Sequence, residues 1–347
     1  MNLEKILQSK FIFILVAWFT LAALLFFGVD QYMRGGVSEI KPHPTASESQ
    51  YHSLRTQYLS VVRSQGPRQA VEKLKAESER DPVTLYYCHD LMHDVGKEAI
   101  VQLKDFSKAV SFQDATCVSG YIHGVLQEYF STTKDTQSAM KSVCQNHKRD
   151  DFFAWECYHG VGHGLMYFSG NNLPESIEKC SSYDASFARV ACANGVYMEN
   201  FTADEKIHPT VYRKAADPFY PCKEQKDEYK SGCYQNAPIY YLTLNKFNYD
   251  KALRWCSSAE ADFRNICYSG VGSQATRKNM QNIKYVESVC ARGNSQQKNW
   301  CISGIVSYYS GHYGSVEKAA KLCDEFEKRN EETCREAISL HVGSFER

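Results

Sequence analysis

The sequence predicts an all-α protein in which an N-terminal transmembrane helix precedes an α-solenoid of about eight helical hairpins stapled by disulfides. Two observations predict this fold: a long apolar segment near the N-terminus, and cysteines that recur in pairs with a period of about 34 residues. A fixed period of this size is typical of stacked helical hairpins, because each hairpin buries its apolar face only against its neighbours.

The overall composition says little about partners. The chain of 347 residues is long enough for two domains or for one elongated repeat array. Lys and Arg together number 40, as do Asp and Glu, and the sequence has no basic tract. We therefore expect no nucleic-acid partner, since such partners require a positively charged surface.

The apolar segment, residues 11–29, is expected to anchor the protein in a membrane. Its one polar side chain is a threonine, and nineteen residues suffice to span a bilayer as a helix. Lys5 and Lys10 precede it, which predicts a cytoplasmic N-terminus at residues 1–10 and places the bulk of the chain in the periplasm or outside the cell. A cleaved signal peptide is the alternative, but its apolar core is normally shorter. Residues 30–50, rich in Gly, Pro and Ser, are predicted to form a stalk.

The fourteen cysteines support export, because they lack the short CxxC pairs of zinc ribbons and because disulfides form outside the cytoplasm. Six pairs are separated by 11 to 13 positions: Cys144–Cys157, Cys180–Cys192, Cys222–Cys233, Cys256–Cys267, Cys290–Cys301 and Cys323–Cys334. Cys88 and Cys117 remain. We expect them to bond to each other across neighbouring hairpins; the alternative is two thiolates that bind metal beside histidines.

One unit, residues 248–276, shows how a hairpin is built: "NYDKALRWCSSAEADFRNICYSGVGSQAT". Asp250 is the expected N-cap of the first helix, and a polar turn leads into the second. A disulfide would then join the end of one helix to the start of the next. The arrangement resembles the helical repeats of the tetratricopeptide and Sel1-like type, some of which are also disulfide-linked. The resemblance is architectural, covers residues 67–347 and implies no function.

A glycine recurs three positions after the second cysteine of the units, where it interrupts an expected helix. The recurrent positions are Gly120, Gly160, Gly195, Gly270 and Gly304. Glycine inside a helix costs about 1 kcal/mol relative to alanine, so a recurrent one indicates close approach of a neighbouring helix.

The repeats fall into two groups on either side of an insertion. Residues 51–200 carry most of the histidines, and residues 222–347 carry regular cysteine pairs and many tyrosines. These tyrosines are expected either to fill the core or to line a concave surface for a protein or peptide partner. The insertion, residues 201–221, contains His208 and is expected to be either a lid over a site or a spacer loop.

Five histidines recur in register on the second helices of three adjacent hairpins. The later histidine of each unit is His93, His123 and His163; one turn earlier lie His89 and His159, with Ser119 in the remaining place. Residues four apart share a helix face, so stacking these helices would gather five imidazoles into one patch. The similar segment at Cys267 has serine at both positions, so packing does not require histidine there.

The histidine pattern predicts a transition-metal site. Imidazole suits iron, copper or zinc and does not suit calcium or magnesium. Five imidazoles exceed the needs of one tetrahedral zinc, which leaves one metal with spare partners or two metals. Glu199 and Asp94 are the acids predicted to move protons, with a bound water as nucleophile or dioxygen as oxidant.

Two further resemblances concern this site. The segment "LMHDVGK", residues 91–97, resembles the histidine–aspartate motif of HD-domain phosphohydrolases, which would imply His93 and Asp94 as metal ligands. The layout is also similar to that of a helical-repeat hydroxylase in which histidines and acids from facing hairpins hold two irons. That enzyme's His-Glu motifs are not found in this sequence.

Three functions remain open from the sequence. The first is a membrane-tethered, extracytoplasmic metalloenzyme, either a redox enzyme such as a hydroxylase or a hydrolase. The second is a binding protein whose array displays a partner surface and whose metal is structural or is the cargo. The third is a scaffold whose histidines bind nothing.

Overall fold

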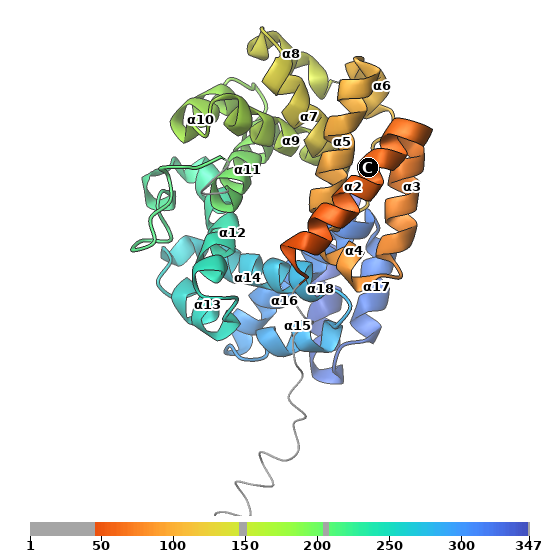
Figure 1. Ribbon diagram of the computed structural model, residues 1–347. Coiled ribbons are helices and arrows are strands. Elements are labelled where there is room, and N and C mark those ends of the chain that lie inside the picture. The colour runs from red at the N-terminus through yellow and green to blue at the C-terminus, as the bar shows by residue number, and fades with distance from the viewer. Residues whose placement is uncertain (1–45, 146–150, 204–207, 346–347) are drawn as a thin grey trace, which may run out of the picture. The chain divides into compact units, whose positions relative to one another are not determined.

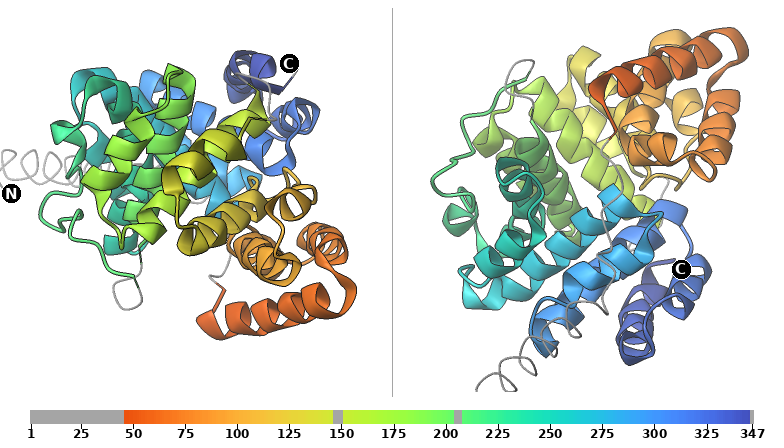
Figure 2. Two further views of the ribbon diagram at one scale, coloured as in Figure 1. Left: turned by 90° about the horizontal axis from the view of Figure 1, so that it is seen from above. Right: turned by 60° about the horizontal axis from the view of Figure 1, so that its bottom comes forward.

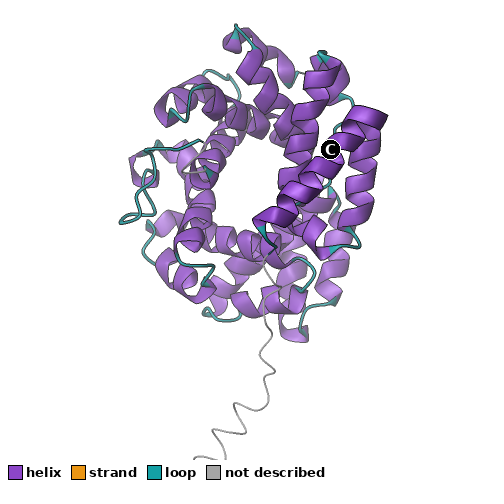
Figure 3. Ribbon diagram, in the orientation of Figure 1, coloured by secondary structure: helices purple, strands orange, loops and turns teal. Residues whose placement is uncertain are grey.

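The computed structural model describes residues 46–145, 151–203 and 208–345, all within the larger of two compact units, residues 42–347. The predicted membrane anchor and most of the stalk lie outside the described residues. Within them the structure is all α-helical (Figure 3) and contains no strand. None of these described helices combines the length and the apolarity that a bilayer span requires.

The first helices arise where the sequence changes from polar linker to amphipathic segments. They are α2 (Glu48–Gln65), α3 (Pro67–Ser78) and α4 (Pro82–Tyr86). Ser47 caps α2 in a capping box with Gln50. Gly66, at φ 92°, ends α2. Pro67 is the first residue of α3, where proline is tolerated because a backbone N–H at this position would have no acceptor within the helix.

From α5 onward the chain alternates between long inner helices and shorter outer ones. The inner helices are α5 (Cys88–Leu103), α7 (Gly120–Thr132), α9 (Phe152–Phe168), α11 (Ser186–Thr202), α12 (Asp227–Leu244), α14 (Arg264–Asn279), α16 (Ser295–Tyr313) and α18 (Lys328–Phe345). The outer helices are α6 (Phe106–Val110), α8 (Thr136–Val143), α10 (Leu173–Ser181), α13 (Tyr249–Cys256), α15 (Ile283–Cys290) and α17 (Val316–Asp324). Short 3-10 turns at Cys222–Glu224 and Ala261–Phe263 complete the series.

Each inner helix packs against the next, and the series curves into a ring (Figure 1). Figure 2 gives two further views, in the left of which the ring is seen from the side. The ring closes because late repeats meet early ones. Arg277 of α14 donates to Asp90 of α5, and the N–H of Cys117 donates to the carbonyl of His312 in α16. The sequence predicted stacked hairpins but not that the array would return to its first repeat.

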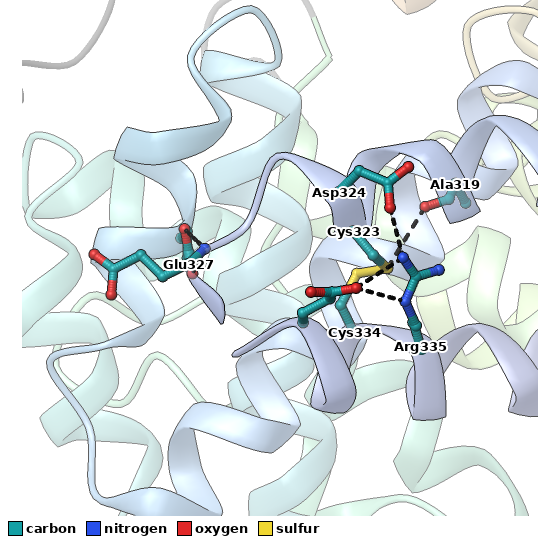
Figure 4. Close-up of a disulfide and its surroundings, with 8 residues drawn as sticks. Ala319, Cys323, Asp324, Glu327, Cys334 and Arg335 are labelled. Atoms are coloured by element: carbon teal, nitrogen blue, oxygen red, sulfur yellow. Dashed lines mark hydrogen bonds and ion pairs between the residues drawn. A yellow bond between two sulfur atoms is a disulfide. The ribbon is translucent and has the colours of Figure 1, made fainter. Parts of the chain in front are cut away.

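The six predicted disulfides each join the end of an outer helix, or in one case the 3-10 turn at Cys222, to the following inner helix, and all fourteen cysteines are bonded. Figure 4 shows one of them, Cys323–Cys334, beside an ion pair in which Arg335 donates to Asp324. Cys88 and Cys117 also bond to each other, which confirms the expected disulfide over the metal-binding alternative.

Two details of the predicted hairpins were wrong. Asn248, not Asp250, caps α13, and its side chain accepts from the N–H of Lys251. Starting the helix earlier lets it bury Tyr249. The helix expected from Cys117 begins instead at Gly120, because residues 117–119 adopt left-handed backbone angles.

The recurrent glycines allow close packing of inner helices, as predicted. A Cβ at Gly195 would collide with the carbonyl oxygen of His159, and one at Gly304 with that of Ser269. A second set, two residues further along, faces the following helix instead: a Cβ at Gly162 would collide with the carbonyl oxygen of Cys192. The backbones of adjacent inner helices therefore touch, which brings the side chains on their inner faces close together.

Candidate metal centre

The five histidines lie on three consecutive inner helices. His89 and His93 are on α5, His123 is on α7, and His159 and His163 are on α9. Within α5 and α9 the separation of four places both rings on one face. Because glycines let these three helices approach closely, the structure brings together all five imidazoles.

His123 is the centre of the cluster. Its ring centroid lies 5.5 Å from that of His89, 5.4 Å from His93, 5.0 Å from His159 and 5.3 Å from His163. The five rings therefore form one group, and each of the other four contacts the ring of α7.

The ring nitrogens of the outer histidines converge in pairs. Nε2 of His93 lies 3.1 Å from Nε2 of His89, and Nε2 of His163 lies 3.0 Å from Nε2 of His159. In two of these rings the other nitrogen, Nδ1, lies within hydrogen-bond distance of a protein oxygen. His89 Nδ1–H donates to the carbonyl of Cys117 at 2.7 Å, and His163 Nδ1 lies 2.7 Å from Glu199 Oε2.

This pattern is characteristic of metal-ligating histidines. A ligating imidazole normally donates its other N–H to a carbonyl or carboxylate, which fixes the tautomer and leaves the first nitrogen free for the metal. The carbonyl of Cys117 does this for His89 and Glu199 does it for His163. Two groups of three histidines could each hold an ion, His89 with His93 and His123, and His123 with His159 and His163; within each group the ligand atoms lie within 4.8 Å of one another.

His123 has an unusual environment for a buried polar ring. It is 1 % exposed, and among the described residues neither of its ring nitrogens has a hydrogen-bond partner. Nε2 does lie 3.1 Å from Glu156 Oε2, a contact without hydrogen-bond geometry. Buried polar groups are nearly always satisfied, so two unpartnered nitrogens at the centre of four other imidazoles are suited to binding an ion.

Burial keeps the imidazoles neutral. It lowers the pKa of His89 to about 3, with a further contribution from the charge of Arg277. It also lowers the pKa of His163 to about 3 and holds the pKa of His93, His123 and His159 well below 6.5. Neutral imidazole is the form that binds metal, so these rings need not lose a proton first.

Glu156 is a site residue that the sequence analysis missed. It lies on α9 next to His123, is 6 % exposed, and burial raises the pKa of its carboxyl to about 7. Helical spacing would have revealed it, because residues 156, 159 and 163 share one face of α9.

The two acids predicted for catalysis occupy different surroundings. Glu199 on α11 contacts His163, and burial raises the pKa of its carboxyl. Asp94 on α5 instead accepts from the hydroxyl of Tyr51 and pairs with Arg55, whose Nε lies 3.0 Å away. The carboxylate of Asp94 is thus held by α2, and it belongs to neither group of potential ligands.

A left-handed turn fixes the first histidine. Cys117, Val118 and Ser119 all have positive φ, a conformation that costs energy for residues other than glycine and is often found at functional sites. The turn is held by the disulfide to Cys88 and by the bond to His312, and its Cys117 carbonyl accepts from His89. Strain in this turn is therefore coupled to the orientation of a potential ligand.

A cavity of about 430 Å³ opens beside the cluster on the inner face of the ring. His89, His123 and His159 line one side of it, with Glu156. The later repeats line another side with Ser273 and Ser307, the serines that replace histidine in the repeat pattern, and with Arg277 and Tyr308.

The insertion, expected to be either a lid or a spacer loop, lies away from the cavity in its described part. His208 in the insertion stacks on Tyr167, with ring centroids 4.8 Å apart, and its carbonyl accepts from Asn171. Neither His208 nor any other residue of the insertion lines the cavity, among the residues that can be placed there.

Comparisons of the chain with known protein families, curated proteins and solved structures find no match. We therefore infer the function from the chemistry of the site alone.

Proposed function

We propose that the five histidines hold one or two transition-metal ions and that the protein is a metal-dependent enzyme acting on a small molecule in the central cavity. The observation that carries this proposal is His123, which is fully buried, open at both ring nitrogens and surrounded by four other neutral imidazoles. An all-nitrogen donor set of this kind suits iron, copper or zinc. The bound metal would supply Lewis acidity or redox chemistry.

The protein's own groups would orient ligands and move protons. His89, His123 and His159 face the cavity, so an ion held there would be open to a substrate. Glu156 lies beside His123 on the same wall and is placed to accept or return a proton. Glu199 would act from the other side, by fixing the ring of His163. Asp94, predicted as a second proton carrier, is bound by Tyr51 and Arg55 and does not support that role.

The cavity favours an enzyme over a carrier or a scaffold. A purely structural or stored ion needs only its ligands, whereas this cluster adjoins a hollow large enough for a small organic molecule. A small molecule also fits the enclosed inner face better than the protein or peptide partner expected of an open array.

The disulfides and the N-terminal sequence support a proposal for the cellular location. Seven disulfides are typical of an oxidising, extracytoplasmic compartment. We propose that residues 11–29 tether the protein to a membrane with the helical unit in that compartment.

Elemental analysis of the purified protein tests the proposal, with visible absorption to separate iron or copper from zinc. We expect bound metal in the native protein and its loss in a His93→Ser/His163→Ser variant that keeps its helical circular dichroism. His52→Ser is the matched control, because its side chain is 64 % exposed. A native protein that binds none of these metals, even after refolding with each, contradicts the proposal.

A further inference from the structure

The wall of the cavity that the later repeats form carries Arg277 and Tyr308, two donors that the proposed metal site does not use. We propose that the substrate is a small monocarboxylate, whose carboxylate binds Arg277 and Tyr308 while its apolar body packs against Trp155 and Phe187. This inference rests on the proposed function, since it places the substrate in the same cavity as the metal.

Arg277 is a buried cation with unused donors. Its side chain is 10 % exposed and lines the cavity. Nη2 donates to Asp90 at 2.9 Å, and no other hydrogen bond of the guanidinium is found among the described residues. A guanidinium has five N–H donors in a planar fork that matches a carboxylate. Several donors thus remain for a ligand in the cavity.

Tyr308 adds a hydroxyl donor on the next inner helix. It lines the cavity too, and its hydroxyl has no hydrogen-bond partner among the described residues. Burial raises the pKa of Tyr308 to about 12, so the hydroxyl keeps its proton at neutral pH. A protonated phenol beside a guanidinium can donate to the same carboxylate.

The charges around the cavity argue against a dianion. Apart from the histidines, its ionisable lining consists of Arg277, Tyr308 and two acids, Asp151 at the N-cap of α9 and Glu156 within α9. Asp90 already neutralises part of the charge of Arg277. One guanidinium with one acidic partner suits a carboxylate better than a phosphate dianion, which would need further positive charge.

A further part of the wall is apolar and aromatic, beside the amide side chains of Asn194, Gln235, Asn236 and Gln274. Phe152, Trp155, Phe187 and Met198 line it, and the rings of Trp155 and Phe187 lie 5.7 Å apart in an edge-on arrangement. Aromatic surface of this kind stabilises an apolar or aromatic substrate body through burial and ring contacts.

The two donors lie close to the proposed metal centre. Arg277 and His89 line the same cavity, and Asp90, the partner of Arg277, directly follows His89 in α5. A short acid anchored at Arg277 can therefore reach the histidines within one cavity.

Binding of three acids tests the inference, each against the alcohol of the same skeleton: acetate with ethanol, benzoate with benzyl alcohol, and 3-phenylpropionate with 3-phenylpropanol. Affinity is measured by calorimetry and by intrinsic tryptophan fluorescence, on metal-loaded and metal-free protein. We expect at least one acid to bind about tenfold or more tightly than its alcohol, and the aromatic acids to bind more tightly than acetate.

Substitutions at Arg277 and Tyr308 test whether these residues bind the carboxylate, and a control substitution elsewhere tests for general effects of removing a charge. Tyr308→Phe should weaken acid binding about tenfold without weakening the alcohol. Arg277→Gln combined with Asp90→Asn should abolish the preference for the acid, and the paired change avoids leaving Asp90 with an unmatched charge. Arg292→Gln, which removes an exposed guanidinium paired with Asp250, should change nothing.

The outcomes distinguish this inference from the proposed function. Metal-loaded protein that shows no preference for any acid, or that binds inorganic phosphate as tightly as the acids, overturns the inference and leaves the metal centre standing. An acid preference that depends on Arg277 in a protein unable to bind metal supports the anion site and contradicts the proposed function instead.

Discussion

Arg277 and Asp90 are 187 residues apart in sequence, yet Nη2 of the arginine lies 2.9 Å from Oδ1 of the aspartate at the edge of the histidine cavity. The pair joins α14, the sixth inner helix, to α5, the first, and so helps to close the ring. Because the ring encloses the cavity, a contact between distant repeats contributes directly to the geometry of the site.

Asp90→Asn should lower the free energy of unfolding by about 1 kcal/mol, a modest value because the aspartate side chain is 42 % exposed. Asp250→Asn is the matched control, since it breaks a comparable pair with Arg292 on the outside of the unit. We expect the control to change stability by less than about 0.5 kcal/mol in urea denaturation. Equal effects of the two changes would contradict a special role for ring closure.

His123→Ser should reduce metal binding more than any other single histidine change. His123 belongs to both groups of potential ligands, whereas His93→Ser leaves the second group complete and His159→Ser leaves the first. Metal content and affinity are measured by elemental analysis and by competition with a chromophoric chelator. If the His123→Ser variant retains as much metal as the His93→Ser and His159→Ser variants, His123 is not the central ligand.

Acid should destabilise the metal-free protein strongly. Buried His89, His163 and His312 have pKa values of about 3, while the unfolded chain takes up these protons near pH 6.5. The unfolded state thus binds more protons below pH 6.5, and the free energy of unfolding falls by roughly 1.4 kcal/mol per pH unit for each such histidine. Glu156, with a pKa of about 7, works in the opposite direction and offsets about one of them between pH 4.5 and 7.

Urea denaturation at pH 7 and pH 5, after removal of metal by a chelator, measures this slope. His52→Ser should leave it unchanged, because that side chain is exposed. His163→Ser should reduce the slope by an amount that corresponds to about one fewer proton taken up on unfolding. A stability that does not vary between pH 7 and pH 5 would show that the cluster is not buried in its neutral form.

Removal of the Cys88–Cys117 disulfide, by alanine at both positions, should affect the metal site as well as stability. Opening a loop of this size costs about 3 kcal/mol. The carbonyl of Cys117 also fixes the tautomer of His89, so metal affinity should fall about tenfold or more.

The Cys323–Cys334 disulfide offers the control for this experiment. It staples the last hairpin, and alanine at both positions should lower stability while leaving metal affinity unchanged. Equal losses of metal affinity in the two proteins would mean that the effect comes from general destabilisation.

Gly195→Ala should lower the free energy of unfolding by about 1 to 3 kcal/mol, because the new methyl group would meet the carbonyl of His159 and force α9 and α11 apart. Gly311→Ala is a matched change in α16, where the methyl group would make only ordinary contacts, 3.7 Å from Val118. There alanine should stabilise the helix by up to about 1 kcal/mol. Thermal denaturation distinguishes the two signs.

Much of the architecture could be predicted because it depends on local and periodic features. The spacing of paired cysteines indicates hairpins of fixed size, and the structure confirms every pair. Recurrent glycines such as Gly195 indicate close helix packing, which the structure also confirms. The register of His93, His123 and His163 predicted a shared face, and the rings do lie together.

What could not be predicted depends on the curvature of the array and on side-chain direction. The 16 helical residues of α5 do not reveal that Asp94 turns toward Tyr51 while His93 turns toward His163. Glu156 could have been predicted from helical periodicity, because it shares a face of α9 with His159 and His163. A single glutamate is a weaker signal than histidines that recur in register.

The sequence by itself determined the helical hairpins, their disulfides and the five histidines on one face, because each of these follows from spacing along a single helix or between adjacent ones. Only the tertiary structure decided that the array closes on itself, which brings Arg277 and Tyr308 to the cavity of His123. The physical reason is that small rotations between successive repeats accumulate over the whole series, and no local pattern records their sum.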